Sequence, residues 1–356
     1  MKSAFFDKHL RVEVRDVPIP VPAPGQILIR TVVSGTNPKD WKYPKLWASD
    51  REASNHGDDI AGYVEAVGDG VVGFHPGDRV AAFHEMATPH GSYAEYSIAW
   101  AKSTFHVSAN VSFEEAATIP LAAMTAALGL YQRLGLPLPW NPATTPLPLI
   151  VYGGATAVGS YAIKLAKFSN IHPIISVAGN STAYVESLLD KTKGDVVIDY
   201  RKGNNHVVEE IRKAAGSSVI YALDAVSEKG SITNIGKALA EGGKVATVLT
   251  PEMSIHGNED PGNAEILFTM VGTVHQDTSP TAQAVGAKFG DREFGAVFFH
   301  YFGLGLTEGW FNGHPYEVVE GGLDGLENAL RVLEEGKLSA KKLVLRIADT
   351  KGLGKA

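Results

Sequence analysis

The residues best suited to chemistry are the glycines of VYGGATAVGSYAIKLAK, residues 151–167. A short apolar run leads into a glycine-rich turn, and the turn leads into a segment with helical spacing. A strand, turn and helix in this order place backbone N–H groups and the positive end of the helix dipole against phosphates. Gly153 or Gly154 can make the tight turn, and Gly159 lets the helix pack close to the sheet. The segment therefore predicts a dinucleotide-phosphate site, in which Thr156 replaces the middle glycine of the usual pattern.

The segment 176–181, SVAGNS, bears on which dinucleotide binds, because it ends the next predicted strand. A site for NAD commonly has Asp or Glu about 20 residues beyond the glycines, bound to the ribose 2′-hydroxyl. No acid occurs in this segment, and a carboxylate would repel a 2′-phosphate, so its absence favours NADPH. Tyr200 and Arg201 follow the third predicted strand and can cover the adenine and reach the phosphate. Alternatively, both are ordinary strand-end residues.

Alternating elements surround the glycine turn. Strands are expected at 149–152, 173–177, 195–200, 218–224 and 244–250, and helices at 157–168, 181–191, 205–215 and 230–243. This alternation predicts a parallel, doubly wound α/β sheet and argues against an ordinary strand–helix turn at the glycines. The apolar segment 264–275 is ambiguous.

The rest of the chain has a different character. The first 120 residues read as β-rich, and the helical pattern begins only at residue 112. The segment 112–135 is helical, with capping-box spacing between Ser112 and Glu115. The segment 137–149 is a proline-rich loop. A helix is expected across 292–306, and the end of the chain reads as strand, helix, strand.

Composition excludes several kinds of site. The sequence contains no cysteine, which excludes disulfides, iron–sulfur clusters, cysteine-ligated zinc and cysteine nucleophiles. A net charge of -7 argues against nucleic acid or an anionic membrane as a partner. The absence of a long apolar run or a signal-like N-terminus makes a cytoplasmic location the expectation.

The chain resembles the medium-chain dehydrogenase/reductase superfamily. The resemblance rests on DIAGYVEAVGDGVVGFHPGDRV (59–80), the glycine turn and the ending in KKLVLRI, and it spans essentially the whole chain. It implies a GroES-like, β-rich catalytic domain formed by 1–121 and 300–356. A Rossmann-type dinucleotide-binding domain, 122–299, would be inserted between them.

Zinc-dependent alcohol dehydrogenases of this superfamily have a histidine ligand where this chain has Asp58, and cysteine ligands that it lacks altogether. His56, His84 and His90 are scattered loop histidines. No metal site is therefore expected, and a zinc alcohol dehydrogenase is a remote alternative.

The chain looks most like the zinc-independent, quinone-oxidoreductase-like branch, and within it like fungal trans-acting enoyl reductases. TNPKDWK (36–42), the proline-rich loop, VYGGATAVG and VVIDYRKG (196–203) carry this likeness. It implies reduction of an activated C=C (enone or enoyl) or of a quinone with NADPH by direct hydride transfer. The substrate would be a small molecule or a carrier-bound acyl group, and the protein a monomer or homodimer. A catalytically silent NADPH-binding protein on the same fold is the alternative.

The same resemblance implies a set of cofactor contacts. The segment of Lys39, Asp40, Trp41 and Lys42 would lie against the cofactor, and Thr125 near the nicotinamide carboxamide. Ala155, Thr156, Ala157 and Val158 would hold the pyrophosphate beside Gly153, Gly154 and Gly159. Ser176, Ala178, Gly179, Asn180, Ser181 and Tyr200 would surround the 2′-phosphate and adenine. Leu249, Thr250, Leu343 and Val344 would border the nicotinamide.

Lys42 is the best candidate for a catalytic group, because a cation at the carbonyl oxygen would stabilise an enolate. The alternative is a solvent-exposed lysine beside an aromatic-rich turn. The proton donor stays open among water, Tyr43, Tyr63 and Tyr93.

Overall fold

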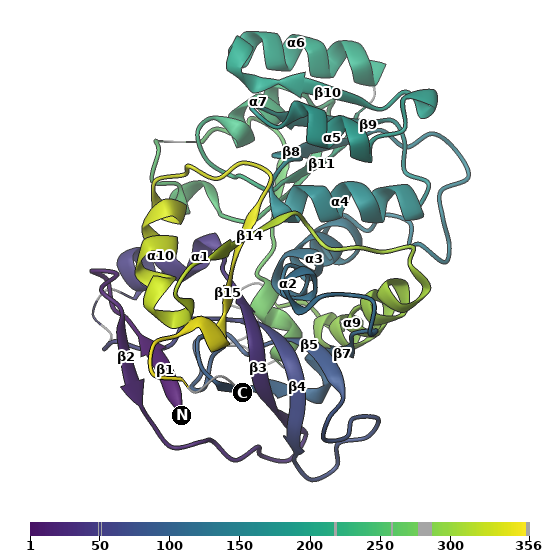
Figure 1. Cartoon of the computed structure of the whole chain (residues 1–356). Helices are drawn as coiled ribbons and strands as arrows, with labels where there is room; N and C mark the ends of the chain where they lie inside the picture. The colour runs from purple at the N-terminus through teal and green to yellow at the C-terminus, as the bar shows by residue number, and fades with distance from the viewer. Residues whose placement is uncertain (49, 51, 217–218, 258, 277–286, 354–356) are drawn as a thin grey trace. The chain divides into compact units, whose positions relative to one another are not determined.

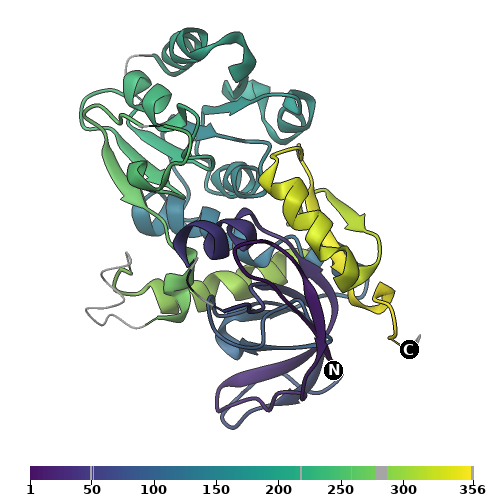
Figure 2. The ribbon, with the colours of Figure 1, turned by 90° about the vertical axis from the view of Figure 1, so that its left-hand side faces the viewer.

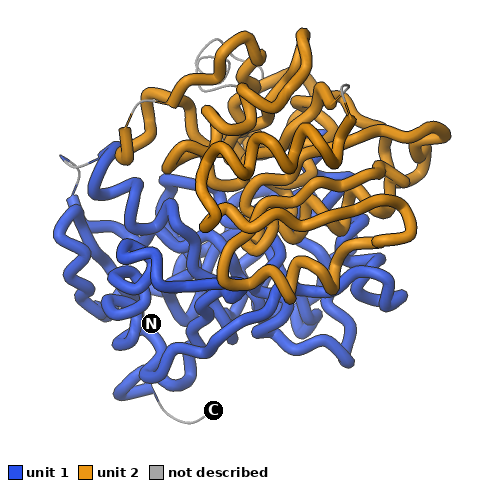
Figure 3. Tube along the Cα trace, turned by 90° about the horizontal axis from the view of Figure 1, so that it is seen from above, with its two compact units in different colours: residues 1–121, 292–356 blue, residues 122–291 orange. Residues whose placement is uncertain are grey.

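The computed structural model describes residues 1–353 except 49, 51, 217–218, 258 and 277–286. The chain forms two compact units (Figure 3): unit 1 consists of Met1–Leu121 and Arg292–Ala356, and unit 2 consists of Ala122–Asp291. The sequence predicts a catalytic domain of residues 1–121 and 300–356 and a dinucleotide-binding domain of residues 122–299. This division by function stays a prediction.

The unit of residues 122–291 is built on a parallel sheet. Its strands lie in the order β10-β9-β8-β11-β12-β13, so β8, the first in the chain, lies in the middle (Figure 1). The chain reverses its direction of travel across the sheet between β8 and β11, which is where ligands bind in doubly wound folds. The strands are β8 (Leu149–Tyr152), β9 (Ile174–Ala178), β10 (Val196–Asp199), β11 (Tyr221–Asp224), β12 (Lys244–Thr247) and β13 (Glu265–Phe268). The predicted α/β class is confirmed, and the ambiguous segment contributes the sixth strand.

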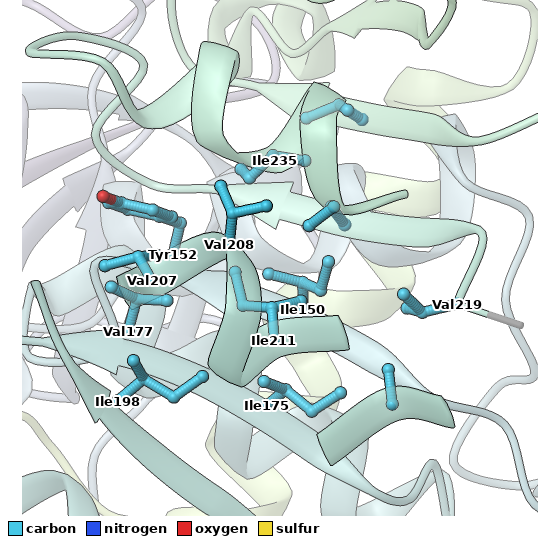
Figure 4. Packing of buried hydrophobic residues seen from close by; sticks show 14 residues of the cluster. Ile150, Tyr152, Ile175, Val177, Ile198, Val207, Val208, Ile211, Val219 and Ile235 are labelled. Carbon is cyan, nitrogen blue, oxygen red and sulfur yellow. The ribbon is translucent and has the colours of Figure 1, made fainter. Parts of the chain in front are cut away.

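Helices cover this sheet and explain its continuous apolar strands. Every residue of β8 and β9 is buried, as expected where helices lie on both faces. Ile150, Ile175 and Val177 of the sheet pack with Val207 and Ile211 (Figure 4). The helices are α3 (Pro120–Ala127, which begins in the other unit), α4 (Ala157–Phe168), α5 (Thr182–Leu188), α6 (Asn204–Ala215) and α7 (Ser231–Ala238).

The unit of residues 1–121 and 292–356 is built on a mostly antiparallel sheet in the order β14-β15-β3-β4-β5-β7, with β6 also paired to β3. Strand β15, near the end of the chain, pairs antiparallel with β3, so both ends of the sequence share one sheet (Figure 2). The strands are β1 (Lys2–Phe5), β2 (Glu13–Asp16), β3 (Gln26–Gly35), β4 (Asp59–Val67), β5 (Arg79–Phe83), β6 (Tyr96–Trp100), β7 (Thr104–His106), β14 (Tyr316–Val319) and β15 (Lys342–Arg346). The helices are α1 (Pro38–Lys42), α2 (Phe113–Ala116), α9 (Asp291–Glu308) and α10 (Leu326–Glu334).

The helical segment 112–135 differs in detail from its prediction. Ser112 caps α2 by accepting a hydrogen bond from the Glu115 N–H at 3.1 Å, as the capping-box spacing indicated. The segment is then divided into α2, α3 and a π-helical stretch, Leu128–Arg133. Pro120 explains the first break, because proline lacks an N–H and fits only the first turn of a helix.

A buried ion pair joins distant parts of the antiparallel sheet. The Lys342 ammonium lies 2.5 Å from Asp59 Oδ2, and both side chains are almost fully buried. Asn37 Nδ2 donates to the same carboxylate oxygen at 2.7 Å, and the Leu121 N–H donates to Oδ1 at 2.7 Å. One carboxylate therefore fixes the loop before α1, the first turn of α3 and the start of β15.

Lys342→Met tests this ion pair, because it leaves the Asp59 charge buried without a cation. Removing one partner of a buried pair costs about 3–5 kcal/mol, so the unfolding free energy should fall by that order. Lys341→Met is the matched control, because its partner Glu317 is half-exposed and surface pairs contribute about 0–1 kcal/mol. Urea denaturation measures both, and equal losses in the two variants would contradict the role of Asp59.

Candidate active site

The glycine turn after β8 has the geometry of an anion site. Gly153 has φ +80°, and Thr156 caps α4 by accepting a hydrogen bond from the Gly159 N–H at 3.0 Å. A Cβ on Gly159 would lie 2.2 Å from the Gly153 carbonyl oxygen, so only glycine fits there. The N–H groups of the first turn have no partner within the helix. Since Thr156 accepts the hydrogen bond of the Gly159 N–H, the N–H groups of Ala157 and Val158 could donate to an anion.

A second group of predicted residues gathers where β9 and β10 end side by side. The parallel register pairs Asp199 with Ala178, which brings Tyr200 beside Gly179. A Cβ on Gly179 would lie 2.5 Å from the Tyr200 ring, so the glycine permits this contact. The Tyr200 side chain is half-exposed, as is required of a surface that covers a ligand. Ser176 lies beneath the glycine turn, with its hydroxyl 2.0 Å from where a Gly154 Cβ would be.

The fold supplies an arginine at this edge that the segment 176–181 lacks. Arg201 Nη1 donates to Asn180 Oδ1 at 2.7 Å, and its guanidinium pairs with Asp199 at 2.5 Å. The hydrogen bond from Arg201 lowers the pKa of Asp199 to about 2. The Asp199 carboxylate at the end of β10 is therefore ionised, and the charge of Arg201 compensates its negative charge.

Helix α1 carries Lys39 into a buried cluster of charges. Asn37 precedes the helix, and its N–H donates to Asp40 Oδ2 at 2.6 Å, while Pro38 occupies the first turn. Lys39 Nζ lies 2.6 Å from Asp58 Oδ2 and 3.2 Å from Asp40 Oδ1, and it also donates to the His56 carbonyl oxygen. Within unit 1, two carboxyl groups thus share one ammonium.

Tyr93 completes this cluster. Its hydroxyl donates to Asp40 Oδ2 at 2.6 Å, and its side chain is fully buried. Burial, together with the charge of Asp40, raises the pKa of Tyr93 well above its usual value. Tyr93 is therefore a fixed hydrogen-bond donor.

The pKa of one carboxyl group in the cluster is raised. Burial lifts the pKa of Asp58 from 3.8 to about 7, although Lys39 opposes the rise. Burial alone would lower the pKa of Lys39, but Asp58 and Asp40 outweigh it and raise that pKa. At neutral pH Lys39 is therefore charged, and Asp58 carries a proton for part of the time.

Lys42 follows on the last turn of α1 and is not the exposed lysine of the alternative interpretation. Its side chain is 8% exposed, and its ammonium lies 5.6 Å from the centre of the Trp41 ring. Trp41 is buried as well and packs among Phe6 and Tyr93. The aliphatic part of the Lys42 side chain is therefore packed within the protein.

The remaining predicted residues lie in both units. Leu343 and Val344 lie in β15, and the Leu343 carbonyl accepts a hydrogen bond from Thr36 Oγ1 at 3.0 Å, just before α1. Thr125 lies in α3, and Leu249 and Thr250 follow the carboxyl end of β12. Unit 1 thus groups residues 39–42 with 343–344, and unit 2 holds the others.

Sequence reasoning missed the roles of Asp58 and Tyr93, and it expected Lys39 only as a cofactor contact. The signal that could have found them is a lysine one residue after Pro38 and an aspartate directly before a strand. His84 is also buried, which lowers its pKa to about 4, and its Nδ1 lies 2.6 Å from the Ile98 carbonyl oxygen. Among the residues described, no group of three or more histidine, aspartate or glutamate side chains is placed to hold a metal ion. In the same part of the chain, no helix is long and apolar enough to cross a membrane.

The comparisons with known proteins agree with this geometry. The alcohol dehydrogenase GroES-like domain matches residues 23–109. The trans-enoyl reductase fsr4 of Gibberella fujikuroi is 44% identical over 325 residues, covering 90% of this chain and 91% of that protein. The enoyl reductase component lovC of the lovastatin nonaketide synthase of Aspergillus terreus is 29% identical, covering 93% and 91%. An alcohol dehydrogenase superfamily protein from Novosphingobium aromaticivorans shares the fold, with a TM-score of 0.77 at 21% identity over 97% and 99% of the two chains.

Fold and site define an oxidoreductase that uses a nicotinamide dinucleotide, with a GroES-like sheet and a Rossmann-type sheet. The chain belongs to the family of the fungal trans-enoyl reductases, in the zinc-independent branch of the medium-chain dehydrogenase/reductase superfamily.

Asp58→Asn tests the buried charge cluster through its pH dependence. Because the pKa of Asp58 is raised from 3.8 to about 7 by folding, the folded chain binds more protons between these values. The contribution of Asp58 to stability therefore declines as pH rises through this window. The unfolding free energy of Asp58→Asn relative to the wild type should rise from pH about 4 to about 7. Urea denaturation at a series of pH values, with the exposed Asp69→Asn as control, measures this, and a difference that is constant across the window would contradict the account.

Proposed function

We propose that the protein reduces the conjugated C=C of an enoyl substrate, carried as a thioester, with NADPH as the hydride donor. The observation that carries the proposal is the 44% identity to a trans-enoyl reductase over nine-tenths of the chain. The name of a second relative, the enoyl reductase component of a nonaketide synthase, supports a carrier-bound acyl group over a free small molecule.

Three features support NADPH over NADH. The segment 176–181 holds no acid, Asp199 is neutralised by Arg201, and Arg201 lies against Asn180 at the end of β9. A 2′-phosphate placed there would meet a guanidinium, which forms short, charge-assisted hydrogen bonds to phosphate oxygens. The half-exposed ring of Tyr200 beside Gly179 offers a face for the adenine.

The two units have separate tasks in this proposal. The glycine turn and the N-terminus of α4, residues 153–159, hold the pyrophosphate, and Thr125, Leu249 and Thr250 border the nicotinamide. Leu343, Val344 and the α1 segment, residues 39–42, belong to the GroES-like unit and bind the nicotinamide and the substrate. Within α1, Asp40 and Lys39 act as positioning residues, because their side chains are occupied in the buried cluster.

When bound, the cofactor supplies hydride to the β-carbon of the substrate, which leaves negative charge on the carbonyl oxygen. Lys42 stabilises this oxygen, because a held cation interacts more strongly with an enolate than with a neutral carbonyl. We do not assign Tyr93 as the proton donor, since its hydroxyl is buried and donates to Asp40. Water, Tyr43 and Tyr63 remain as donors to the α-carbon.

A substrate panel tests the proposed function. Enoyl thioesters, alkenals and quinones are each mixed with NADPH or NADH, and loss of the reduced cofactor is followed by absorbance. The proposal requires turnover of an enoyl thioester with NADPH, faster than with NADH. Tight NADPH binding without turnover of any compound would instead support a catalytically silent binding protein. Turnover of quinones alone would contradict the enoyl substrate and assign a quinone in its place.

Lys42→Ala should reduce turnover and leave NADPH affinity nearly unchanged, because its benefit lies in the transition state. Removing one such donor costs about a hundred- to a thousandfold in kcat. Turnover at saturating NADPH and the dissociation constant of NADPH are the two measurements. A fall in affinity with turnover preserved would make Lys42 a cofactor ligand. Lys45→Ala is the control, since Lys45 is a half-exposed lysine paired with Glu334.

Arg201→Ala should weaken NADPH binding much more than NADH binding. The substitution removes a cation from the expected 2′-phosphate position and leaves Asp199 uncompensated beside it. Fluorescence titration with both cofactors measures the effect, and Arg212→Ala, an exposed arginine on α6, is the control. Ala178→Asp should act in the same direction. Equal losses for NADPH and NADH would count against the phosphate role.

A further inference from the structure

Unit 1 contains an apolar pocket, most of whose lining residues lie outside the site described above. Its volume is about 680 Å³, within the range of small-molecule pockets. Phe5, Val17, Ile19 and Ala87 supply its apolar wall, and Tyr43 and His56 line it as well. We refer to it as the N-terminal pocket.

Several polar groups of this pocket are hydrogen-bonded within the protein, and Glu52 and His90 line it as well. Asn55 Nδ2 donates to Ser3 Oγ at 3.2 Å and to the Gly91 carbonyl oxygen at 3.0 Å, and Ser54 Oγ lies 3.1 Å from His56 Nε2. Thr88 Oγ1 donates to the Glu85 carbonyl oxygen at 2.7 Å. Most of the surface that lines the pocket is nevertheless apolar, so the pocket favours an apolar group.

The lining also includes an apolar side chain that the protein leaves in water. Ile19 is 50% exposed in the proline-rich segment that follows β2, although it borders the pocket. An apolar ligand would remove this surface from water, which is favourable roughly in proportion to the area covered.

The pocket adjoins the elements assigned to the substrate. Tyr43 directly follows Lys42, and its ring lies 5.5 Å from that of His56. The His56 carbonyl oxygen accepts the hydrogen bond of the Lys39 ammonium, so the wall of the pocket is tied to the buried charge cluster. The pocket therefore lies beside the segment that carries Lys42.

We infer that the N-terminal pocket binds the distal, aliphatic end of the acyl substrate and so makes the enzyme selective for longer chains. This rests on the proposed function, in which the thioester carbonyl lies at Lys42. Each methylene that enters the pocket should raise kcat/KM by about fourfold, the factor that corresponds to burying one CH₂.

The test uses enoyl-N-acetylcysteamine thioesters of four, eight and twelve carbons with the full chain and NADPH. Ile19→Asp puts a charge on the pocket wall and should lower kcat/KM for the longer substrates while sparing the four-carbon one. Val21→Asp is the matched control: Val21 is 87% exposed in the same proline-rich segment but does not line the pocket, so its chain-length profile should match the wild type. An equal loss of kcat/KM at every length in Ile19→Asp, or a flat profile in the wild type, would overturn the inference.

A binding measurement separates this inference from the proposed function. The saturated dodecanoyl-N-acetylcysteamine is titrated by calorimetry into the wild type, Ile19→Asp and Val21→Asp. Weaker binding in Ile19→Asp alone supports the pocket even if no enoyl thioester is reduced. Absence of binding in the wild type, or equal binding in all three proteins, contradicts it whatever the turnover.

Discussion

A single buried carboxylate, that of Asp59, holds together the part of the protein that is assigned to the substrate. It lies at the first residue of β4 and binds Lys342, Asn37 and the first turn of α3. Lys342 begins the strand that carries Leu343 and Val344, and Asn37 precedes the helix that carries Lys39 and Lys42. A buried charge is tolerated only when it is paired and hydrogen-bonded, so the three segments are held to one arrangement. Because an unpaired carboxylate would be unfavourable here, Asp59 holds Lys342, near the end of the chain, beside Asn37, near its beginning.

The neighbouring residue, Asp58, belongs to the second buried charge cluster of this unit. Its carboxyl group is balanced by the ammonium of Lys39, which comes from α1. Burial, and to a smaller extent the charge of Asp40, which shares that ammonium, raises the pKa of Asp58 to about 7. The result is a helix whose inner face is fixed by charge and whose last turn presents Lys42. In this account the protein contributes position and a localised positive charge, while the chemistry of hydride transfer belongs to the cofactor.

Much of the fold follows from the sequence, because apolar periods and glycine turns are local signals. The strands and helices of the parallel sheet and the anion geometry at Gly153 and Gly159 are examples. Helix α1 was missed because five residues are too few to show a period, and its existence depends on Asn37 and Pro38. Strand β13 was ambiguous because a short apolar run is compatible with either structure. Arg201 beside Asn180 and Lys39 beside Asp58 depend on strand register and on burial, which no local pattern contains. The assignment of individual residues to cofactor and substrate stays a prediction.

The account's central claim is direct hydride transfer from NADPH to the β-carbon of an enoyl thioester. The most direct measurement uses NADPH that carries deuterium at each of the two C4 positions in turn, with an enoyl thioester as the substrate. The saturated product is then analysed by mass spectrometry and NMR. The account predicts one deuterium per product molecule, on the β-carbon and from only one of the two labelled cofactors. A saturated product without deuterium from either cofactor, or with deuterium on the α-carbon, would contradict it.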